Sequence, residues 1–386
     1  MAVNGDDAFV QLRRRLHAAP ELSEQETETA AMIRAALEAA APDRVLTGLG
    51  AMGTGVCAVF DSGTPGPTVL LRCELDALPI QESNRFEHRS RHPGVAHKCG
   101  HDGHMATLVA VADGLRRSPI ARGRAYLLFQ PAEETGTGAA AVIADAQFQS
   151  LPPPDFVYAF HNVPRYPLGR VLVRDGLFAQ ASVAFIVRFG GTTSHSSYPE
   201  HGVNPARAAT ALVEAVDGFD RSFDGVLPVL GTISYAEIGR VDTGTNFGTT
   251  PGEARIMGVL RAECDEDLDG LRQQLDALAA ELAGASGLEH ALSWHEAFAA
   301  TRSDPDCVRT VELAAERAGF DVERLTDPFR WSEDFGYFTS AYKGAFFGLG
   351  SGANQPQLHD DGYDYPDELI GIGAALYRGI LDSHLS

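Results

Sequence analysis

Lysine is almost absent from this chain, which contains only Lys98 and Lys343 among its 386 residues. Arginine supplies nearly all of the 31 basic residues, which face 52 acidic ones and leave a formal net charge of −21. Nucleic acids and anionic membranes are bound through basic faces, so this charge argues against both as partners. An acidic excess with little lysine suits a protein that works at high salt, where self-repulsion is screened.

Long apolar runs and a disulfide framework are missing as well. The longest apolar stretches, such as Val69–Leu71 and Tyr126–Phe129, are too short to cross a bilayer. The first residues show no basic segment followed by an apolar one, so we expect a cytoplasmic protein without a membrane partner. The five cysteines are odd in number and scattered, and we expect all except Cys99 to pack as small hydrophobic residues.

The length of the chain favours two domains, because one core of this size is rare. Strands alternate with helices over residues 55–161, which predicts an α/β fold with a mostly parallel, helix-covered sheet. The order then becomes β-α-β-β-α-β, which is typical of a ferredoxin-like α+β module. We therefore expect a catalytic domain made of residues 1–177 and 295–386, with a second domain, residues 178–294, inserted into it.

Two local signals concern the first helices. The pattern predicts an N-terminal helix from about Asp6 to Ala18, which stops before Pro20. Ser23 and Glu26 have the spacing of a capping box, which predicts the start of a second helix.

The segment from His97 to His104 reads His-Lys-Cys-Gly-His-Asp-Gly-His. Neither a hydrophobic core nor an ordinary solvated turn needs three imidazoles, a thiol and a carboxylate so close together. In an extended segment, the side chains of Cys99 and His101 would leave the same face and reach one ion. A thiolate with imidazoles suits zinc or a neighbouring first-row metal, so this run indicates a metal site.

Acids and histidines also follow the predicted strands of the sheet. Ligands of open α/β sheets collect at the carboxyl ends of the strands, so these residues are expected to converge. Glu74 and Asp76 follow the predicted strand at 68–73, and Glu133 and Glu134 follow the predicted strand at 124–129. His161 ends the predicted strand that begins at Phe156, and His359 comes after the predicted strand at 344–349.

Glu133 and Glu134 form the second strong signal. Adjacent carboxylates repel each other, so a buried pair needs a cation or a shared proton. Beside a metal, one can be a ligand and the other a base that takes a proton from water. The alternative is an exposed acidic start to the following helix. His195 lies in a loop of small polar residues in the inserted module, which fits either a substrate contact or a plain turn.

With these motifs in place, the sequence resembles the co-catalytic metallopeptidase family of aminoacylases and carboxypeptidases. Within it, the chain is most similar to the amidohydrolase branch of hippurate hydrolases, auxin-conjugate hydrolases and N-acyl amino acid deacylases. The resemblance covers nearly the whole chain. The matching motifs are Leu75–Ile80, Cys99–His104, Phe129–Glu134, Ser194-His195, Ser332–Phe335 and Leu358-His359.

The resemblance implies a metallo-amidohydrolase that cleaves N-acyl amino acids with metal-activated water and a glutamate base. It implies two divalent metal ions, zinc, manganese, nickel or cobalt, and a homodimer formed through the inserted lid domain. The implied metal ligands are Cys99, His101, Glu134, His161 and His359. The other implied roles are Glu133 as catalytic base, Asp76 as support of the metal centre, His195 as the residue that holds the substrate carbonyl, and Asn246 as a substrate contact.

Two departures from the branch concern substrate preference. The segment Asn246–Pro251 differs from the usual Asn-Val-Ile-Pro pattern, and Trp331 stands where a small residue is common. A dipeptidase or carboxypeptidase with the same two-metal centre is the first alternative function. A non-catalytic metal-binding protein is the second, and it is disfavoured because a closed structural zinc site needs no base such as Glu133.

Overall fold

The structure is a computed structural model that describes residues 7–219, 229–239 and 247–386. The chain divides into two compact units. The first unit comprises Met1–Phe178, Thr301–Phe329 and Asp334–Ser386, and the second comprises Ala179–Ala300 and Arg330–Glu333. Among the described residues, no helix is long and apolar enough to span a membrane.

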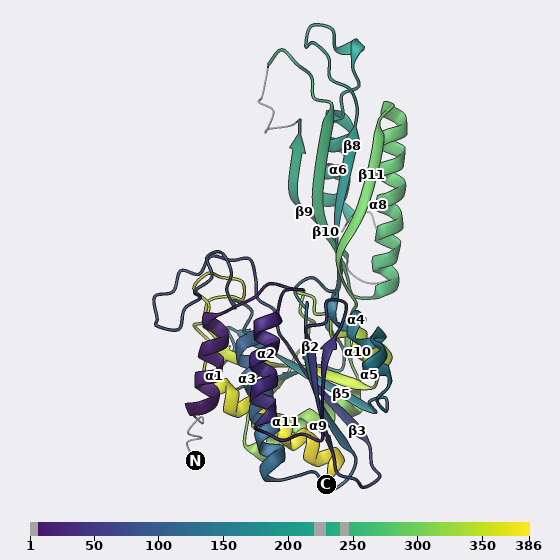
Figure 1. Ribbon diagram of the computed structural model, residues 1–386. Helices are drawn as coiled ribbons and strands as arrows, with labels where there is room; N and C mark the ends of the chain where they lie inside the picture. Colours follow the sequence, from purple (N-terminus) through teal and green to yellow (C-terminus); the bar gives the residue numbers. More distant parts are fainter. Residues whose placement is uncertain (1–6, 220–228, 240–246) are drawn as a thin grey trace. The chain divides into compact units, whose positions relative to one another are not determined.

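The first unit is built on a mixed sheet that, among the described residues, has eight strands (Figure 1). Their order is β1-β2-β4-β3-β5-β14-β6-β13, and the four neighbours β4, β3, β5 and β14 run parallel. The parallel strands therefore end at the same edge of the sheet. The strands are β1 (Arg44–Leu49), β2 (Gly55–Asp61), β3 (Thr68–Glu74), β4 (Arg124–Gln130), β5 (Phe156–Pro164), β6 (Val171–Val173), β13 (Val322–Arg324) and β14 (Gly344–Gly352).

Helices cover both faces of this sheet, which explains why its central strands are buried along almost their whole length. Figure 1 shows α1, α3 and α11 on one side and α4, α5 and α10 on the other. On β14, the ring centroid of Phe347 lies 6.1 Å from that of Tyr377 of α11. The ring centroid of its neighbour Phe346 lies 5.5 Å from that of Phe335, on the opposite face of the sheet. The helices are α1 (Asp7–Ala18), α2 (Thr27–Glu38), α3 (His101–Arg117), α4 (Gly138–Ala144), α5 (Ala146–Gln149), α9 (Pro305–Ala318), α10 (Gly336–Ala341) and α11 (Glu368–Leu385). Two short strands, β7 (Gly176–Ala179) and β12 (Thr301–Ser303), form a separate pair.

Within its described residues, the second unit contains a four-stranded antiparallel sheet of order β11-β8-β10-β9. Every second residue of β10 is buried, which is the pattern of a sheet with one covered face. The predicted β-α-β-β-α-β order and α/β class are confirmed. The elements are β8 (Ala181–Gly190), a short 3-10 helix (Pro199–His201), α6 (Ala206–Asp217), β9 (Val229–Ile238), β10 (Glu253–Ala262), α8 (Asp265–Ser286) and β11 (Glu289–Phe298).

The predicted capping box is wrong, because both of its side chains are used for contacts inside the unit. The hydroxyl of Ser23 donates to Oδ2 of Asp76 at 2.7 Å. The carboxylate of Glu26 is buried and accepts a hydrogen bond from the amide of Ala132 at 2.8 Å. The residue before helix α2, Glu26, therefore gives no side-chain cap. The first-turn amides of Glu28 and Thr29 instead donate to the carboxylate of Glu21.

Candidate metal centre

The four parallel strands deliver the predicted residues to one edge of the sheet. Asp76 follows β3, Glu133 and Glu134 follow β4, and His161 lies within β5. The loop after β14 carries His359. The residues that were expected to converge therefore lie at one edge of the sheet, although they come from four segments that are distant in sequence.

The turn between Cys99 and His101 has a different geometry from the expected one. An extended segment was expected, but Gly100 has a φ of +97° and His101 is already the first residue of α3. Left-handed backbone favours glycine, and a Cβ at this position would lie 2.6 Å from Oδ1 of Asn162. The turn leaves Sγ of Cys99 3.3 Å from Nε2 of His161.

Distances between the candidate ligand atoms fit a shared ion. Ligand atoms of one zinc ion lie about 2.0–2.3 Å from the metal, so two of them are at most about 4.5 Å apart. The 3.3 Å separation of Cys99 and His161 satisfies this limit, as does the 3.7 Å between Nε2 of His359 and Oε2 of Glu134. Cys99, Glu134 and His359 also present ligand atoms that all lie within 4.8 Å of one another.

His101 gives the clearest sign that a cation belongs in this site. Its ring is buried, and its Nε2 has no hydrogen-bond partner among the described residues. That atom lies 3.8 Å from Oε2 of Glu133 and 3.9 Å from Oε1 of Glu134. Burial lowers the pKa of His101, but the hydrogen bond to Asp76 and the charges of the nearby glutamates outweigh it and raise the pKa to about 10. The surroundings therefore favour positive charge at this point, as a metal site requires.

Asp76 connects two of the ligand-bearing segments. Its backbone oxygen lies 2.8 Å from Nδ1 of His101, and its Oδ2 accepts a hydrogen bond from the amide of Glu134 at 2.9 Å. Burial raises the pKa of Asp76, but the hydrogen bonds from His101, Glu134 and Ser23 outweigh it and lower the pKa below its ordinary value. The buried carboxylate is therefore ionised, and its Oδ2 accepts hydrogen bonds from both Ser23 and Glu134.

Glu133 and Glu134 lie in a strained turn that buries Glu133 and leaves Glu134 partly buried. Ala132 has a φ of +52°, an unusual value for a residue with a side chain. The carboxylate of Glu26 accepts a hydrogen bond from the amide of Ala132, and the carboxylate of Asp76 accepts one from the amide of Glu134. Glu133 is buried, and the next helix begins only at Gly138. An exposed acidic helix start does not fit this geometry, whereas a metal ligand beside a base does.

A buried ionic network binds Lys98 and Asp102, the residues on either side of the Cys99-Gly100-His101 turn. The sequence interpretation missed this network. Asp102 lies 2.7 Å from Nε of Arg13 and 2.9 Å from Nδ1 of His17. Glu82 lies 3.1 Å from Nε2 of His17 and accepts a hydrogen bond from Nζ of Lys98 at 2.6 Å. The four-residue spacing of Arg13 and His17, which places them on one face of α1, is the signal that could have indicated it.

The remaining predicted residues lie elsewhere. His97 is buried, makes no side-chain hydrogen bond among the described residues, and has its pKa lowered by burial to about 3. His195 belongs to the second unit, where its side chain is exposed and its Nδ1 accepts a hydrogen bond from the amide of Ser197. Asn246 lies outside the described residues.

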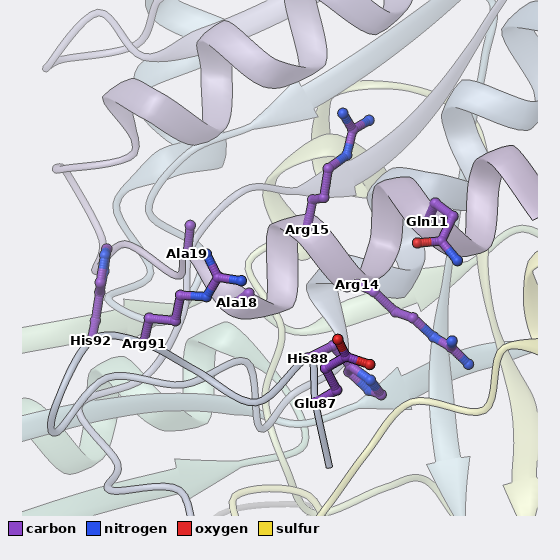
Figure 2. A pocket seen from close by; sticks show the side chains of 9 residues that line it. All are labelled: Gln11, Arg14, Arg15, Ala18, Ala19, Glu87, His88, Arg91 and His92. Carbon is purple, nitrogen blue, oxygen red and sulfur yellow. The ribbon is translucent and has the colours of Figure 1, made fainter.

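A cavity of about 580 Å³ lies beside α1, and none of the candidate ligands lines it. Figure 2 shows that Arg14 and Arg15 leave α1 in different directions around it. Arg14 is paired with Asp367 at 2.7 Å. The residues that line the cavity are Gln11, Arg14, Arg15, Ala18, Ala19, Glu87, His88, Arg91 and His92. It is therefore separate from the candidate metal centre.

A thiol, imidazoles and paired carboxylates at the ends of parallel strands define a metal-dependent hydrolase. The chain belongs to Peptidase family M20/M25/M40, whose sequence profile matches residues 70–383. The resemblance noted from the motifs is thereby confirmed. As a member of this family, the protein is an enzyme that hydrolyses amide bonds.

Individual relatives agree with this assignment. The chain is 31% identical to N-acetyl-L-cysteine deacetylase of Bacillus subtilis (strain 168), over 91% of this chain and 82% of the relative. It is 26% identical to N-acetyldiaminopimelate deacetylase of Lactobacillus helveticus (strain DPC 4571), over 99% and 98%. The fold matches the crystal structure of a dinuclear metal-binding peptidase of the M20 family from Bacillus subtilis, with a TM-score of 0.79 and 24% identity over 99% of this chain and 98% of that one.

Proposed function

We propose that this protein is a metal-dependent amidohydrolase that cleaves the amide bond of N-acyl amino acids. The observation that carries the proposal is the adjacent pair of buried Glu133 and partly buried Glu134 beside Nε2 of His101. This arrangement supplies a ligand and a base at the same point. The two deacetylase relatives supply the substrate class by analogy.

Five residues would hold two divalent ions: Cys99, His101, Glu134, His161 and His359. Five side chains exceed the four ligands of one tetrahedral ion, which supports a pair of ions. Zinc, manganese, nickel and cobalt all suit a thiolate, imidazole and carboxylate set. When bound, such ions supply Lewis-acid chemistry that activates water and polarises the amide carbonyl.

The proton transfers fall to the protein. Glu133 accepts a proton from the attacking water at a carboxylate oxygen and later returns it to the nitrogen of the leaving amine. Asp76 keeps His101 and the Glu134 amide in place during both steps. The products are a carboxylic acid and a free amino acid.

The second unit is proposed to contact the substrate. Its exposed His195 would donate a hydrogen bond to the substrate carbonyl, and Asn246 would bind another polar group of the substrate. His195→Ala is expected to lower kcat by about 10²–10³-fold, the effect of removing one oxyanion donor, while metal content is unchanged. A variant with the wild-type kcat would refute this role of His195.

We also propose a homodimer formed through the second unit. Its described edge strand β9 exposes Leu230, Tyr235 and Ile238, with 37%, 43% and 46% of each residue accessible. An uncovered edge strand with apolar side chains is a natural place for pairing with a second copy. Size-exclusion chromatography with light scattering should give twice the chain mass, and Ile238→Asp should give the monomer mass.

The substrate test uses metal-stripped enzyme reloaded in turn with zinc, manganese, nickel and cobalt. Initial rates are measured on a panel of N-acetyl amino acids and on dipeptides of the same amino acids. We expect kcat/KM to be higher for the N-acetyl compounds. Higher values for the dipeptides would favour the dipeptidase or carboxypeptidase alternative. No hydrolysis at full metal loading would leave the non-catalytic metal-binding protein.

A further inference from the structure

His104 lies one helical turn after His101, so the two imidazoles share a face of α3. Its ring centroid is 5.7 Å from that of His101 and 5.0 Å from that of His161, which it meets edge-on at 84°. His104 itself is buried. The His104 ring therefore packs against the imidazoles of His101 and His161, which are two of the candidate metal ligands.

One ring nitrogen of His104 is bound to a buried carboxylate. Nδ1 donates a hydrogen bond to Oε2 of Glu74 at 2.6 Å. The other oxygen of Glu74 accepts a hydrogen bond from the buried guanidinium of Arg72. Burial raises the pKa of Glu74, but the charges of Arg72 and His104 outweigh it and hold the pKa well below its ordinary value. A charged acceptor thus fixes the rotation of the His104 ring.

The other ring nitrogen reaches the residue that follows His161. Nε2 of His104 lies 2.6 Å from Oδ1 of Asn162, whose Nδ2 donates to the hydroxyl of Tyr363 at 2.6 Å. The backbone oxygen of Asn162 in turn lies 2.9 Å from Nδ1 of His161. Asn162 also fills the space beside Gly100, where a Cβ would lie 2.6 Å from its Oδ1.

We propose that His104 is a positioning residue of the metal centre, which bridges Glu74 to Asn162 and so fixes both the His161 imidazole and the Gly100 turn. The inference rests on the proposed metal centre. It assigns His104 no contact with substrate or metal, because both of its ring nitrogens are already engaged with protein groups.

Removing the His104 bridge between Glu74 and Asn162 is expected to lower metal affinity. Groups that orient metal-binding histidines typically change metal affinity or activity by about 10–100-fold when they are removed. Without His104, Asn162 can shift away from Gly100, and the spacing of Cys99 and His161 is no longer set. A histidine that merely fills the core would lower stability without a specific change in metal affinity.

The test compares His104→Gln, Asn162→Ala and the double variant with the wild-type protein. Co²⁺ affinity is measured by competition with a chelator, and the visible spectrum of the Co²⁺-loaded protein reports the ligand geometry. Unfolding by urea is measured on the metal-free proteins. We expect each single variant to bind Co²⁺ about 10–100-fold more weakly with a changed spectrum, and the double variant to be little worse than either.

Leu108→Ala is the matched control, since Leu108 is a fully buried core residue of the same helix. It should unfold at a clearly lower urea concentration than the wild-type protein and keep the wild-type Co²⁺ affinity and spectrum. A His104→Gln protein with wild-type affinity and spectrum would overturn the inference, as would equal losses of affinity in Leu108→Ala. A wild-type protein that binds no Co²⁺ would instead contradict the proposed function, so the two failures are distinct.

Discussion

Nδ1 of His101 lies 2.8 Å from the backbone oxygen of Asp76, so the ring is held with its opposite nitrogen toward Glu133 and Glu134. The side chain of the same aspartate accepts the amide of Glu134. One residue at the end of β3 thus orients an imidazole and a carboxylate from two other segments. Such indirect support is typical of metal centres in enzymes.

Replacing Asp76 by Ala should therefore weaken metal binding and lower kcat/KM by about 10–100-fold, because the Glu134 turn loses its acceptor. Ser23→Ala is the control, since it removes only one hydrogen bond to Asp76. Metal content after dialysis against a weak chelator measures the effect. Full metal retention by the Asp76→Ala protein would show that Asp76 does not support the centre.

Cys99→Ser should remove the sulfur ligand while the fold is kept. In the Co²⁺-loaded protein, the near-ultraviolet band of a sulfur-cobalt bond should disappear, and metal affinity should fall. Cys307→Ala is the control, because Cys307 is buried in the core of the first unit. If the band persists in Cys99→Ser, or disappears in Cys307→Ala, the thiolate ligand has been misassigned.

Two glycines of α3 should respond in opposite directions to alanine. At Gly103 a Cβ would lie 2.2 Å from the ring of Tyr365, whereas at Gly114 nothing lies within 4 Å. Gly114→Ala should stabilise the protein by about 0.5–1 kcal/mol through helix propensity, and Gly103→Ala should destabilise it by about 1–3 kcal/mol through overpacking. Urea unfolding of both variants gives the comparison. Shifts of the same sign would contradict the packing described for Tyr365.

The stability of the ionic network should depend on acid pH through Glu82. Burial raises the pKa of Glu82, but hydrogen bonds from His17, Lys98 and the Ser90 amide outweigh it and lower the pKa from 4.5 to about 2. A depressed pKa means that the carboxylate stabilises the fold above pH 4.5 and loses this effect as the pH falls toward 2.

Glu82→Gln tests this dependence. At neutral pH the variant should be less stable by about 3 kcal/mol, since it leaves buried cationic groups without their partner. The difference in the free energy of unfolding between wild type and variant should become smaller as the pH falls from 5 to 2, because the wild-type carboxylate becomes protonated over this range. Urea unfolding of both proteins at a series of pH values measures this difference. A difference that stays constant or increases toward pH 2 would show that the ionised Glu82 does not stabilise the fold.

The α/β class and the convergence of the site could be predicted from the sequence. Apolar strands and intervening helices have distinct periods, and polar residues that follow parallel strands must meet at one edge. Asp76, Glu133, His161 and His359 were found in this way. These predictions depend on patterns that are local in the chain.

The contacts that hold the site together could not be predicted, because they join residues that are distant in sequence. Ser23 and Glu26 have the local spacing of a capping box, yet they bind Asp76 and Ala132. The left-handed turn at Gly100 depends on the space that Asn162 occupies beside it. Tertiary packing overrides the local signal at each of these points.

The most direct test of the account is turnover by Glu133→Gln at verified metal loading. The variant should bind both metal ions with wild-type stoichiometry, because Glu133 is proposed as the base and Glu134 as the ligand. Its hydrolysis of an N-acetyl amino acid should fall by about 10²–10⁴-fold, the contribution of general base catalysis. A fully loaded Glu133→Gln enzyme that hydrolyses the substrate at the wild-type rate would contradict the proposed mechanism.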